Sequence, residues 1–403
     1  MRFLVSAILF LFLVKTFAAT PQVVLSVGAD TVMAIKQQVS SNIEILSKDK
    51  EQAIIRIAED KIIPLSGLMH IKFGRCPGFM RYDSIAAAYE FIATQKLAQA
   101  TKGIFNLDYS LTEQDRVEAW VSQIEELSLL QIIVQLSSYK TRYHTSETAQ
   151  QAVKWLKAHW EKMAKNRSDI KVEFIKHQAS PMPSVMMTIS GTEDPDQVVI
   201  VGGHADSIAR SFFGGLGKVA PGADDNASGI ATMSEVIRVL MDNSYRPKKT
   251  VKFIAYAAEE VGLYGSREIA QDFRNRGVNV IGVIQLDMTN FKGSDADIVL
   301  MDDYTNDAQN TFVKKLIDRY VRVKWGVDRC GYGCSDHASW TAMGYPASMP
   351  FESKVREMNH KIHSKNDTLK ISNNHAFHAV KFAKNGFGLC CRISKIITSY
   401  KLA

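Results

Sequence analysis

Short, mostly apolar runs alternate with stretches of helical periodicity through the second half of the chain. The runs are at 198–201, 251–256 and 280–286, and apolar positions recur at helical spacing over 227–242 and 263–275. Continuous apolar runs are typical of strands that are buried on both faces. Strands that alternate with helices predict an α/β fold, with a mixed, mostly parallel central sheet and helices on both faces.

The same alternation begins earlier in the chain. Helices are predicted at 115–136 and 147–164, followed by strands at 171–177, 184–190 and 197–203. The segments SPMPS and GTEDPD separate these strands and are rich in the residues that form turns. The predicted α/β unit therefore extends from about residue 109 to the carboxyl terminus.

The first residues have the features of a secretory signal peptide. Arg2 precedes the apolar run 3–14, and the small residues Ala18 and Ala19 follow it. This run is too short for a stable transmembrane helix, and no later stretch approaches the roughly 20 apolar residues that a membrane span needs. We therefore predict cleavage after residues 1–19, secretion, and a mature form outside the membrane.

Residues 20–108 form a second, smaller unit in the sequence. They contain the alternating apolar segment 53–57 and a helix-compatible run at 85–100, but no cluster of His, Asp and Glu. A break containing Gly and Asn follows Lys102, and a new helix opens after Thr112. We predict a pro-region over 20–108 and a catalytic domain over 109–403. A permanently attached domain is the alternative.

Charge and composition restrict the partners. The chain of 403 residues is 46% hydrophobic and carries a net charge of +7, and its lysines are dispersed rather than gathered in basic runs. Nucleic acid is therefore not an expected partner. Five cysteines in a secreted protein indicate disulfide bonding. Cys330 and Cys334 in the motif CGYGC are the predicted pair. Free thiols are expected at Cys390 and Cys391, and Cys76 lies in the predicted pro-region.

Residues with metal-ligand character follow several predicted strands. His204 and Asp206 end VVIVGGHAD, Glu259 and Glu260 follow VKFIAYA, and Asp287 ends IGVIQLD. The carboxyl ends of neighbouring parallel strands share one edge of a sheet, where α/β proteins bind ligands. Taken singly, such a histidine is an ordinary loop residue, and the run Asp224–Asp225–Asn226 is an ordinary helix cap.

Together these residues predict a zinc site. A set of His and carboxylate ligands without thiolates suits zinc, and a shared carboxylate holds two ions ~3.5–4 Å apart. A further histidine, His363, lies in the later polar stretch HKIHSKNDT. Symmetry predicts that one ion takes His204 and Asp287 and that the other takes Glu260 and His363. Asp225 would bridge the two ions. Adjacent carboxylates at a strand end point in different directions, so Glu259 is expected to face a water molecule.

Several long motifs resemble one known family. GGHADS, APGADDNASGIA, YAAEEVGLYGS, QLDMTN, CGYGCSDHASW and PFES followed by IH are similar to the secreted bacterial leucine aminopeptidases, two-zinc exopeptidases that include the aminopeptidase of marine vibrios. The resemblance covers about residue 109 to the carboxyl terminus. It implies two zinc ions on His204, Asp225, Glu260, Asp287 and His363, with Glu259 as the general base.

The resemblance also implies further roles. Tyr332 would hydrogen-bond the substrate carbonyl oxygen as it becomes an oxyanion, and a cis peptide would join Asp225 to Asn226. Asp206 would orient His204, and Ser335 is expected to orient His363.

The family binds the amino-terminal side chain in an apolar pocket. The residues expected there are Met288, Met301, Cys330, Cys334, Met349, Phe351, Val355, Met358 and Ile362. Met301, Val355 and Met358 stand where the marine enzyme has an isoleucine and two aromatics, and a Met-rich wall is deformable. The choice among Leu, Met, Phe and Tyr therefore stays open.

The implied protein is a secreted, monomeric metalloaminopeptidase. Its partners would be peptides with a free amino terminus and a processing protease that removes the pro-region. Two alternatives share the fold: a single-zinc glutaminyl cyclase and a non-catalytic binding module. The cyclase would not need all five ligands, and the module should lack ligands or the base, whereas all six positions are filled here.

Overall fold

A computed structural model describes residues 20–75, 77–100, 114–165, 167–178, 180–211 and 215–393. The predicted signal peptide, Cys76, the break after Lys102 and the side chains of Cys390 and Cys391 lie outside the described part. No helix within that part is both long and apolar enough to cross a membrane.

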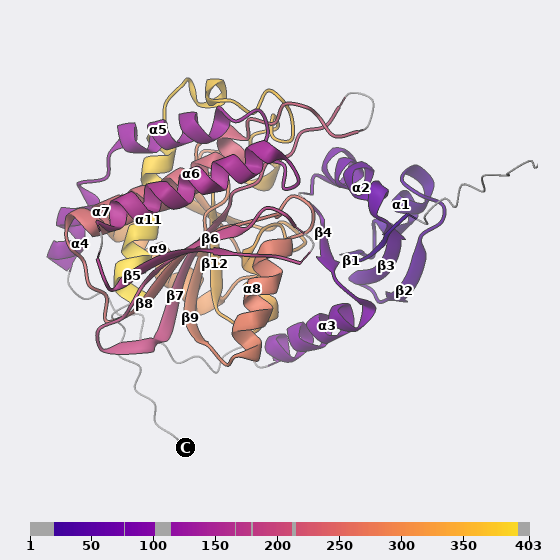
Figure 1. The fold of residues 1–403 in the computed structure, drawn as a ribbon, viewed down its shortest axis with the longest axis horizontal. Coiled ribbons are helices and arrows are strands. Elements are labelled where there is room, and N and C mark those ends of the chain that lie inside the picture. Colours follow the sequence, from indigo (N-terminus) through magenta and orange to yellow (C-terminus); the bar gives the residue numbers. More distant parts are fainter. Residues whose placement is uncertain are drawn as a thin grey trace, which may run out of the picture.

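Residues 20–100 form an amino-terminal unit around a four-stranded antiparallel sheet, drawn in indigo in Figure 1. Its strand order is β2-β3-β1-β4. The strands are β1 (Gln22–Gly28), β2 (Glu44–Lys48), β3 (Gln52–Ala58) and β4 (Phe79–Tyr82), and the helices are α1 (Val32–Gln38), α2 (Ile62–Leu68) and α3 (Ile85–Ala100).

The predicted catalytic domain is built on an eight-stranded mixed sheet in the order β11-β10-β12-β9-β7-β8-β6-β5. The central strands β12, β9, β7 and β8 are parallel to one another, whereas β6 runs antiparallel to both β8 and β5. The strands are β5 (Ile170–Ile175), β6 (Ser184–Ile189), β7 (Asp194–His204), β8 (Lys249–Tyr256), β9 (Asn279–Gln285), β10 (Ile298–Met301), β11 (Trp325–Asp328) and β12 (Ala347–Phe351).

Helices cover both faces of this sheet, as the alternation predicts (Figure 1). The helices are α4 (Gln114–Val121), α5 (Glu126–Ser137), α6 (Glu147–Ala164), α7 (Gly229–Asp242), α8 (Tyr264–Asn275), α9 (Asp307–Leu316), α10 (His337–Ala342) and α11 (Phe377–Ile393). In β7, Val199 and Val201 belong to the core beneath α5, α6, α7 and α11, whereas Ile200 belongs to the core beneath α8 and α10. The apolar run is continuous because its strand is buried on both faces.

The predicted helix over 115–136 is wrong in one respect, because the structure divides it into α4 and α5. The backbone N–H of Glu125 donates to the Glu235 carboxylate at 2.7 Å, so a contact with α7 replaces a helical hydrogen bond at the break. The other predicted elements are confirmed to within a few residues, and α6 and α3 have the predicted bounds.

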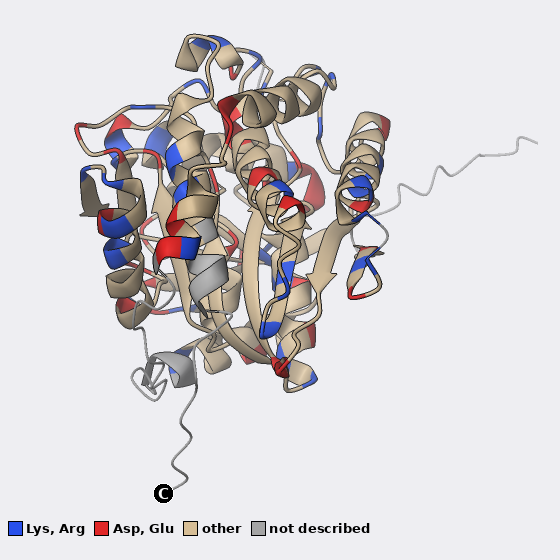
Figure 2. Ribbon diagram, turned by 90° about the vertical axis from the view of Figure 1, so that its left-hand side faces the viewer, with Lys and Arg blue, Asp and Glu red and all other residues tan. Residues whose placement is uncertain are grey.

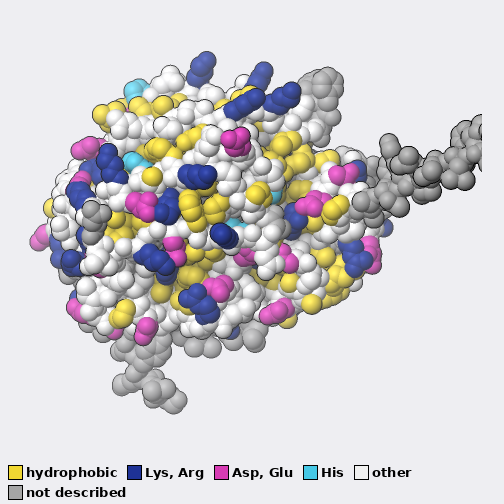
Figure 3. Space-filling model, viewed as in Figure 1, with side chains coloured by type: hydrophobic (Ala, Val, Ile, Leu, Met, Phe, Trp, Pro, Cys, Tyr) yellow, Lys and Arg dark blue, Asp and Glu magenta, His cyan; other side chains and the backbone are white. Residues whose placement is uncertain are grey.

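Charged residues of both signs are intermixed on the molecule. Figure 2 shows Lys, Arg, Asp and Glu interspersed along the helices, and Figure 3 shows the same mixture on the face that it presents. Several of these charges pair within one helix, as Arg238 does with Asp242 in α7 and Lys157 does with Glu161 in α6.

Candidate metal centre and active site

Three adjacent parallel strands deliver the candidate ligands to one edge of the sheet. His204 is the last residue of β7, which lies between β8 and β9. Glu259 and Glu260 follow β8, and Asp287 follows β9. Gly203 allows β7 to pass close to the loop after β9, because a Cβ atom at position 203 would lie 2.7 Å from the Leu286 carbonyl oxygen.

Asp225 and His363 reach this edge from other segments. Asp225 lies in the kinked turn η3 (Ala223–Ser228) before α7, where Asp225 and Asn226 have non-helical backbone angles, and the peptide between them is cis, as the resemblance implied. His363 lies in the loop after β12.

The five residues form two groups of three that share Asp225. The first ligand group is His204, Asp225 and Asp287, and the second ligand group is Asp225, Glu260 and His363. In each group the donor atoms all lie within 4.8 Å of one another. The two oxygens of Asp225 face different histidines, at 3.1 Å from His204 Nε2 and 3.2 Å from His363 Nε2. Asp287 lies 3.3 Å from His204 Nε2, and Glu260 lies 2.8 Å from His363 Nε2.

The donor set fits zinc. Imidazole nitrogens and carboxylate oxygens are common zinc ligands. Glu260 Oε1 is buried without a hydrogen-bond partner among the described residues, and Asp225 Oδ2, Asp287 Oδ1 and Glu260 Oε2 are buried beside the Nε2 atoms of the two histidines. A buried polar atom without a partner is costly, whereas a divalent cation would satisfy all of these oxygens.

The electrostatics of the protein alone indicate excess negative charge. Burial, together with the Asp225 carboxylate, raises the pKa of Glu260 to about 7. Burial lowers the pKa of His363, but the Glu260 and Asp225 carboxylates outweigh it and raise that pKa to about 9. Burial also raises the pKa of Glu259 well above its usual range. Glu259, Glu260 and His363 therefore bind protons readily, and the same negative charge would stabilise metal cations in this place.

Hydrogen bonds fix the loops that carry these residues. Asp206 accepts from the backbone N–H groups of Glu259 at 3.1 Å and Glu260 at 3.2 Å, and it lies 3.5 Å from His204 Nδ1. The Asn226 side chain bonds the Leu286 carbonyl and the Met288 N–H, which flank Asp287. Asn226 therefore connects the turn that carries Asp225 to the loop after β9.

Arg142 is a buried cation beside the metal centre, and the sequence did not predict its role. Its guanidinium donates to the carbonyls of Ala205, Pro221 and Gly222, next to the segments that carry His204 and Asp225. Burial lowers its pKa to about 10, opposed by nearby carboxylates of which Asp367 is the strongest. No local motif marks Arg142, because its partners are distant backbone carbonyls.

The predicted partner of Ser335 is wrong. Its hydroxyl donates to Asp287 Oδ2 at 2.6 Å and accepts from Gln285 at 3.0 Å, so it supports the first ligand group and not His363. Beside His363 Nδ1 lies Arg210 Nη2, at 2.7 Å. Ser335 thus lies at the end of β9, a contact between distant segments that residue spacing could not predict.

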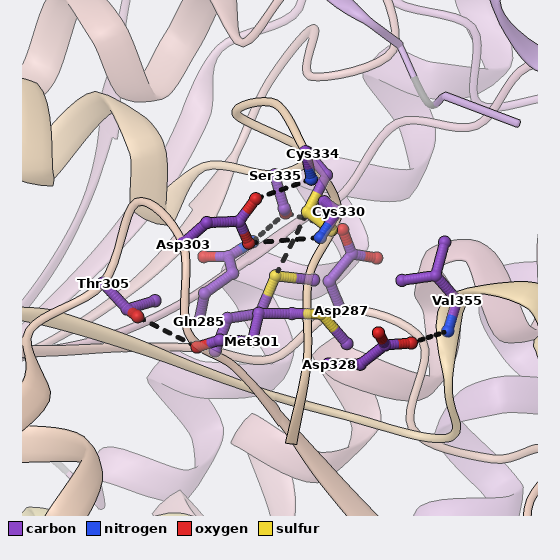
Figure 4. Close-up of a disulfide and its surroundings, with 12 residues drawn as sticks. Gln285, Asp287, Met301, Asp303, Thr305, Asp328, Cys330, Cys334, Ser335 and Val355 are labelled. Carbon is purple, nitrogen blue, oxygen red and sulfur yellow. Dashed lines mark hydrogen bonds between the residues drawn. A yellow bond between two sulfur atoms is a disulfide. The ribbon is translucent and has the colours of Figure 1, made fainter. Parts of the chain in front are cut away.

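The CGYGC loop closes as predicted. Cys330 and Cys334 form a disulfide with a Cα–Cα distance of 6.1 Å, shown in Figure 4. Asp303 is turned toward the start of this loop and accepts the N–H groups of Cys330 and Gly331 (Figure 4). Tyr332, between the two cysteines, lines the pocket that also contains Asp225, Glu259 and Asp287.

That pocket is mostly apolar beyond the carboxylates. Eight of the nine residues expected for side-chain recognition line it: Met288, Cys330, Cys334, Met349, Phe351, Val355, Met358 and Ile362. Met301 is the exception, because it is fully buried in the same apolar cluster as these residues and does not line the pocket. It lies opposite Met349 in the antiparallel pairing of β10 with β12, so its side chain is on the same face of the sheet as that of Met349.

The amino-terminal unit reaches into the same place. Gly74 lines the pocket, and the His70 ring stacks on His363 with centroids 5.0 Å apart. The Arg75 guanidinium lies over the Tyr332 ring, 5.6 Å from its centroid.

Contacts away from the pocket hold the unit in place. Arg210 donates to the Gly67 carbonyl, and Asp83 accepts from Tyr264 at 2.6 Å and from Arg267 at 2.9 Å. Phe91 and Ile92 of α3 share the apolar core of α8 and α10.

Comparison with known proteins agrees with this geometry. The model of "Peptidase family M28" matches residues 184–385. The chain is 31% identical to a probable aminopeptidase of Saccharomyces cerevisiae, over 68% of this chain and 75% of that protein. It is 32% identical to leucine aminopeptidase 1 of Ajellomyces capsulatus, over 76% of this chain and 80% of that protein.

Solved structures resemble nearly the whole chain. The LapA aminopeptidase of Legionella pneumophila matches with a TM-score of 0.81 and 27% identity, over 94% of this chain and 100% of that one. LapB of the same organism matches with a TM-score of 0.79 and 26% identity, over 93% and 100%. A match of this length extends into residues 20–108. The expectation that the resemblance begins only near residue 109 is therefore wrong.

Proposed function

Because the chain belongs to peptidase family M28 and is a zinc-dependent aminopeptidase, we propose that it is a secreted, monomeric enzyme that uses two zinc ions. It removes a large apolar, Leu-like residue from the amino terminus of peptides. The observation that carries the proposal is the sharing of Asp225 between the two ligand groups, which gives each candidate ion one histidine and one carboxylate of its own.

The protein's own residues have distinct tasks in this reaction. Zinc held by the two ligand groups supplies Lewis acidity to the peptide carbonyl and to a water molecule. Glu259 takes the proton from the attacking water and returns it to the leaving amine. The Tyr332 hydroxyl donates a hydrogen bond to the carbonyl oxygen of the substrate as negative charge develops on that oxygen. The free α-amine of the substrate binds at the second ligand group, which restricts cleavage to the first peptide bond.

The apolar pocket supports a preference for large apolar side chains. Its wall contains three methionines, Met288, Met349 and Met358, and two aromatic residues, Tyr332 and Phe351. Methionine side chains adapt their shape to the side chain that they contact. We propose that Leu, Met and Phe are all accepted, and a panel of aminoacyl-nitroanilides would rank them.

The test of the mechanism is Glu259→Ala. We expect activity to fall by roughly 10²–10⁴-fold, the usual contribution of a general base, because no other residue of the motif is available to carry the proton. Zinc content, measured by elemental analysis, should stay at two ions per chain. A variant that keeps more than about a tenth of the activity would contradict the role of Glu259.

Metal content also separates the alternatives. Dialysis against a chelator should abolish hydrolysis, and two equivalents of zinc should be needed to restore it. Full restoration by one equivalent, with activity on amino-terminal glutamine, would favour the single-zinc cyclase. Zinc binding without turnover would favour a binding module.

We further propose that residues 20–108 are a pro-region that a processing protease removes after export. The support is the contact of His70, Gly74 and Arg75 with His363, the pocket and Tyr332. A peptide that enters the pocket would have to displace these residues. Among residues 20–75 and 77–100, which the structure describes, none belongs to either ligand group.

The test compares the long and the shortened chains. The secreted form, sequenced from its amino terminus, should begin between about Gly103 and Gln114. A purified chain that begins near Ala19 should hydrolyse Leu-nitroanilide poorly until a protease cuts the linker. Secretion of the long form with full activity would identify the segment as a permanent domain.

A further inference from the structure

Two more aspartates make the same kind of contact that Asp206 makes with the Glu259–Glu260 loop. Asp206 accepts hydrogen bonds from two consecutive backbone N–H groups of a loop in another part of the chain. Such a pair of bonds fixes both the position and the rotation of the loop, and bonds to a charged acceptor are stronger than neutral ones. We call this contact a double backbone bond.

Asp367 makes a double backbone bond to the turn that carries the shared ligand. Its Oδ1 accepts from the N–H of Asp224 at 3.2 Å, and its Oδ2 accepts from the N–H of Asp225 at 3.1 Å. Its backbone carbonyl accepts from Ala223, and Asn359 donates to Oδ1 at 3.3 Å. The Asp367 side chain is 1% exposed, and all of these partners are donors. It therefore fixes the three consecutive residues of the turn that end at Asp225.

Asp303 makes a double backbone bond to the disulfide loop. Its Oδ1 accepts from the N–H of Cys330 at 3.1 Å, and its Oδ2 accepts from the N–H of Gly331 at 2.6 Å (Figure 4). Tyr332 is the next residue. The Gly331 backbone is in the left-handed region, with φ of 80°, so the loop turns sharply between the bonded amides and the tyrosine.

We propose that Asp367 and Asp303 are positioning residues with separate tasks. Asp367 sets the orientation of Asp225 between the two ligand groups, and Asp303 sets the position of the Tyr332 hydroxyl. Neither aspartate belongs to a ligand group or lines the substrate pocket. The proposal rests on the proposed roles of Asp225 and Tyr332.

The experiment substitutes each aspartate by asparagine in the full chain. Asparagine keeps one acceptor oxygen and presents an N–H₂ group to the second amide, so one bond is lost and a repulsion replaces it. Asp367→Asn should lower zinc affinity by ~10–100-fold, the usual effect of losing a partner of a ligand. Asp303→Asn should leave two zinc ions bound and lower kcat on Leu-nitroanilide by ~10-fold or more after cleavage of the linker.

A double variant shows whether Asp303 acts through Tyr332. Tyr332→Phe should lower kcat by ~10²–10³-fold, as loss of an oxyanion donor does. Adding Asp303→Asn to Tyr332→Phe should cause little further loss, because residues that act as one unit are not additive. Independent, multiplying losses would show that Asp303 supports the fold in general and would overturn its positioning role.

A control separates these effects from general loss of stability. Glu126 in α5 also accepts a backbone N–H from a distant segment, that of Ala376 at 2.9 Å, but it belongs to neither ligand group. Glu126→Gln should change neither zinc affinity nor kcat, and unfolding temperatures measured in chelator should be compared for all variants. Asp367→Ser and Asp303→Ser, whose hydroxyl still accepts one bond, replace any asparagine variant that does not fold.

The outcomes distinguish this inference from the proposed function. If Tyr332→Phe leaves kcat unchanged, the role of Tyr332 and that of Asp303 both fail. If Tyr332→Phe is impaired and Asp303→Asn is not, only the inference about Asp303 fails. Wild-type zinc affinity in Asp367→Asn, alongside lost zinc in Asp225→Ala, would overturn the role of Asp367 alone.

Discussion

The two ligand groups are supported by different parts of the molecule. In the first group, Ser335 donates to Asp287 and Asp206 lies beside His204, and both supports belong to the catalytic domain. In the second group, His363 stacks on His70 of the amino-terminal unit. Arg210, which contacts His363 Nδ1, also donates to the Gly67 carbonyl of that unit.

The difference shows where the amino-terminal unit can act on the metal centre. A histidine that binds a metal usually donates its other N–H to an acceptor. Asp206 Oδ1, a carboxylate oxygen that can accept a proton, lies 3.5 Å from His204 Nδ1, whereas the group beside His363 Nδ1 is the Arg210 guanidinium, which has only donors. The first group is therefore complete within its own domain, and the surroundings of the second change when the unit leaves.

The largest effect is expected from Asp225→Ala, which removes the residue common to both groups. Each group would keep one histidine and one carboxylate, so zinc content should fall from two ions per chain toward zero. Activity should fall by at least the ~10²–10⁴-fold that a general base supplies, and the unfolding temperature should fall with the metal, because metal binding is linked to folding. Unchanged zinc stoichiometry would disprove the shared ligand.

Ser335→Ala should affect the first ligand group alone. Loss of the 2.6 Å hydrogen bond to Asp287 should lower the affinity for one zinc ion by ~10–100-fold. The affinity for the other zinc ion, measured in the same titration of the apoprotein, should stay unchanged. The effect should be equal before and after the linker is cut, because Ser335 touches only the catalytic domain.

The matched control for Ser335 is Ser339→Ala. Its hydroxyl is also buried, but it bonds the Ser266 hydroxyl at 2.9 Å and supports no ligand. Both zinc equivalents should bind this variant normally. If Ser335→Ala instead weakened the equivalent held by Glu260 and His363, the division of support between the two groups would be wrong.

Much of the fold and the grouping of the ligands could be predicted because both depend on local pattern. An apolar run such as 198–201 marks a buried strand, and a polar residue directly after it must lie at the sheet edge. The spacing of the cysteines likewise predicted the disulfide. These inferences need only the direction of a strand and the residue that ends it.

The remaining features depend on how distant loops approach one another. Arg142, Asn226 and Asp367 act through backbone groups of other segments, which carry no sequence signature. Ser335 was assigned to the wrong ligand for the same reason. Met301 stands at a pocket position of the family, but it is fully buried and does not line the pocket here.

The smallest effect concerns the attachment of the amino-terminal unit through Asp83. Burial raises the pKa of Asp83, but the charge of Arg267 and the hydrogen bonds from Tyr264 and Arg267 outweigh it, so the pKa is lowered from 3.8. A carboxyl group whose pKa is lower in the docked state than in the free state strengthens docking when the pH lies above its free pKa. This contribution is lost as the pH falls through the pKa of the docked state. Docking through Asp83 should therefore weaken below about pH 4.

Asp83→Asn should remove this part of the pH dependence. The Asp83 side chain is 35% exposed, so solvent screening limits the expected loss at pH 7 to about 1 kcal/mol, or roughly fivefold in affinity. The measurement is the dissociation constant of the unit after the linker is cut, at pH 7 and below pH 4. Asp49→Asn is the control, because the side chain of Asp49 bonds Glu51, Gln52 and Lys96, which all belong to its own unit. If both variants kept the wild-type pH dependence, Asp83 would not couple docking to pH.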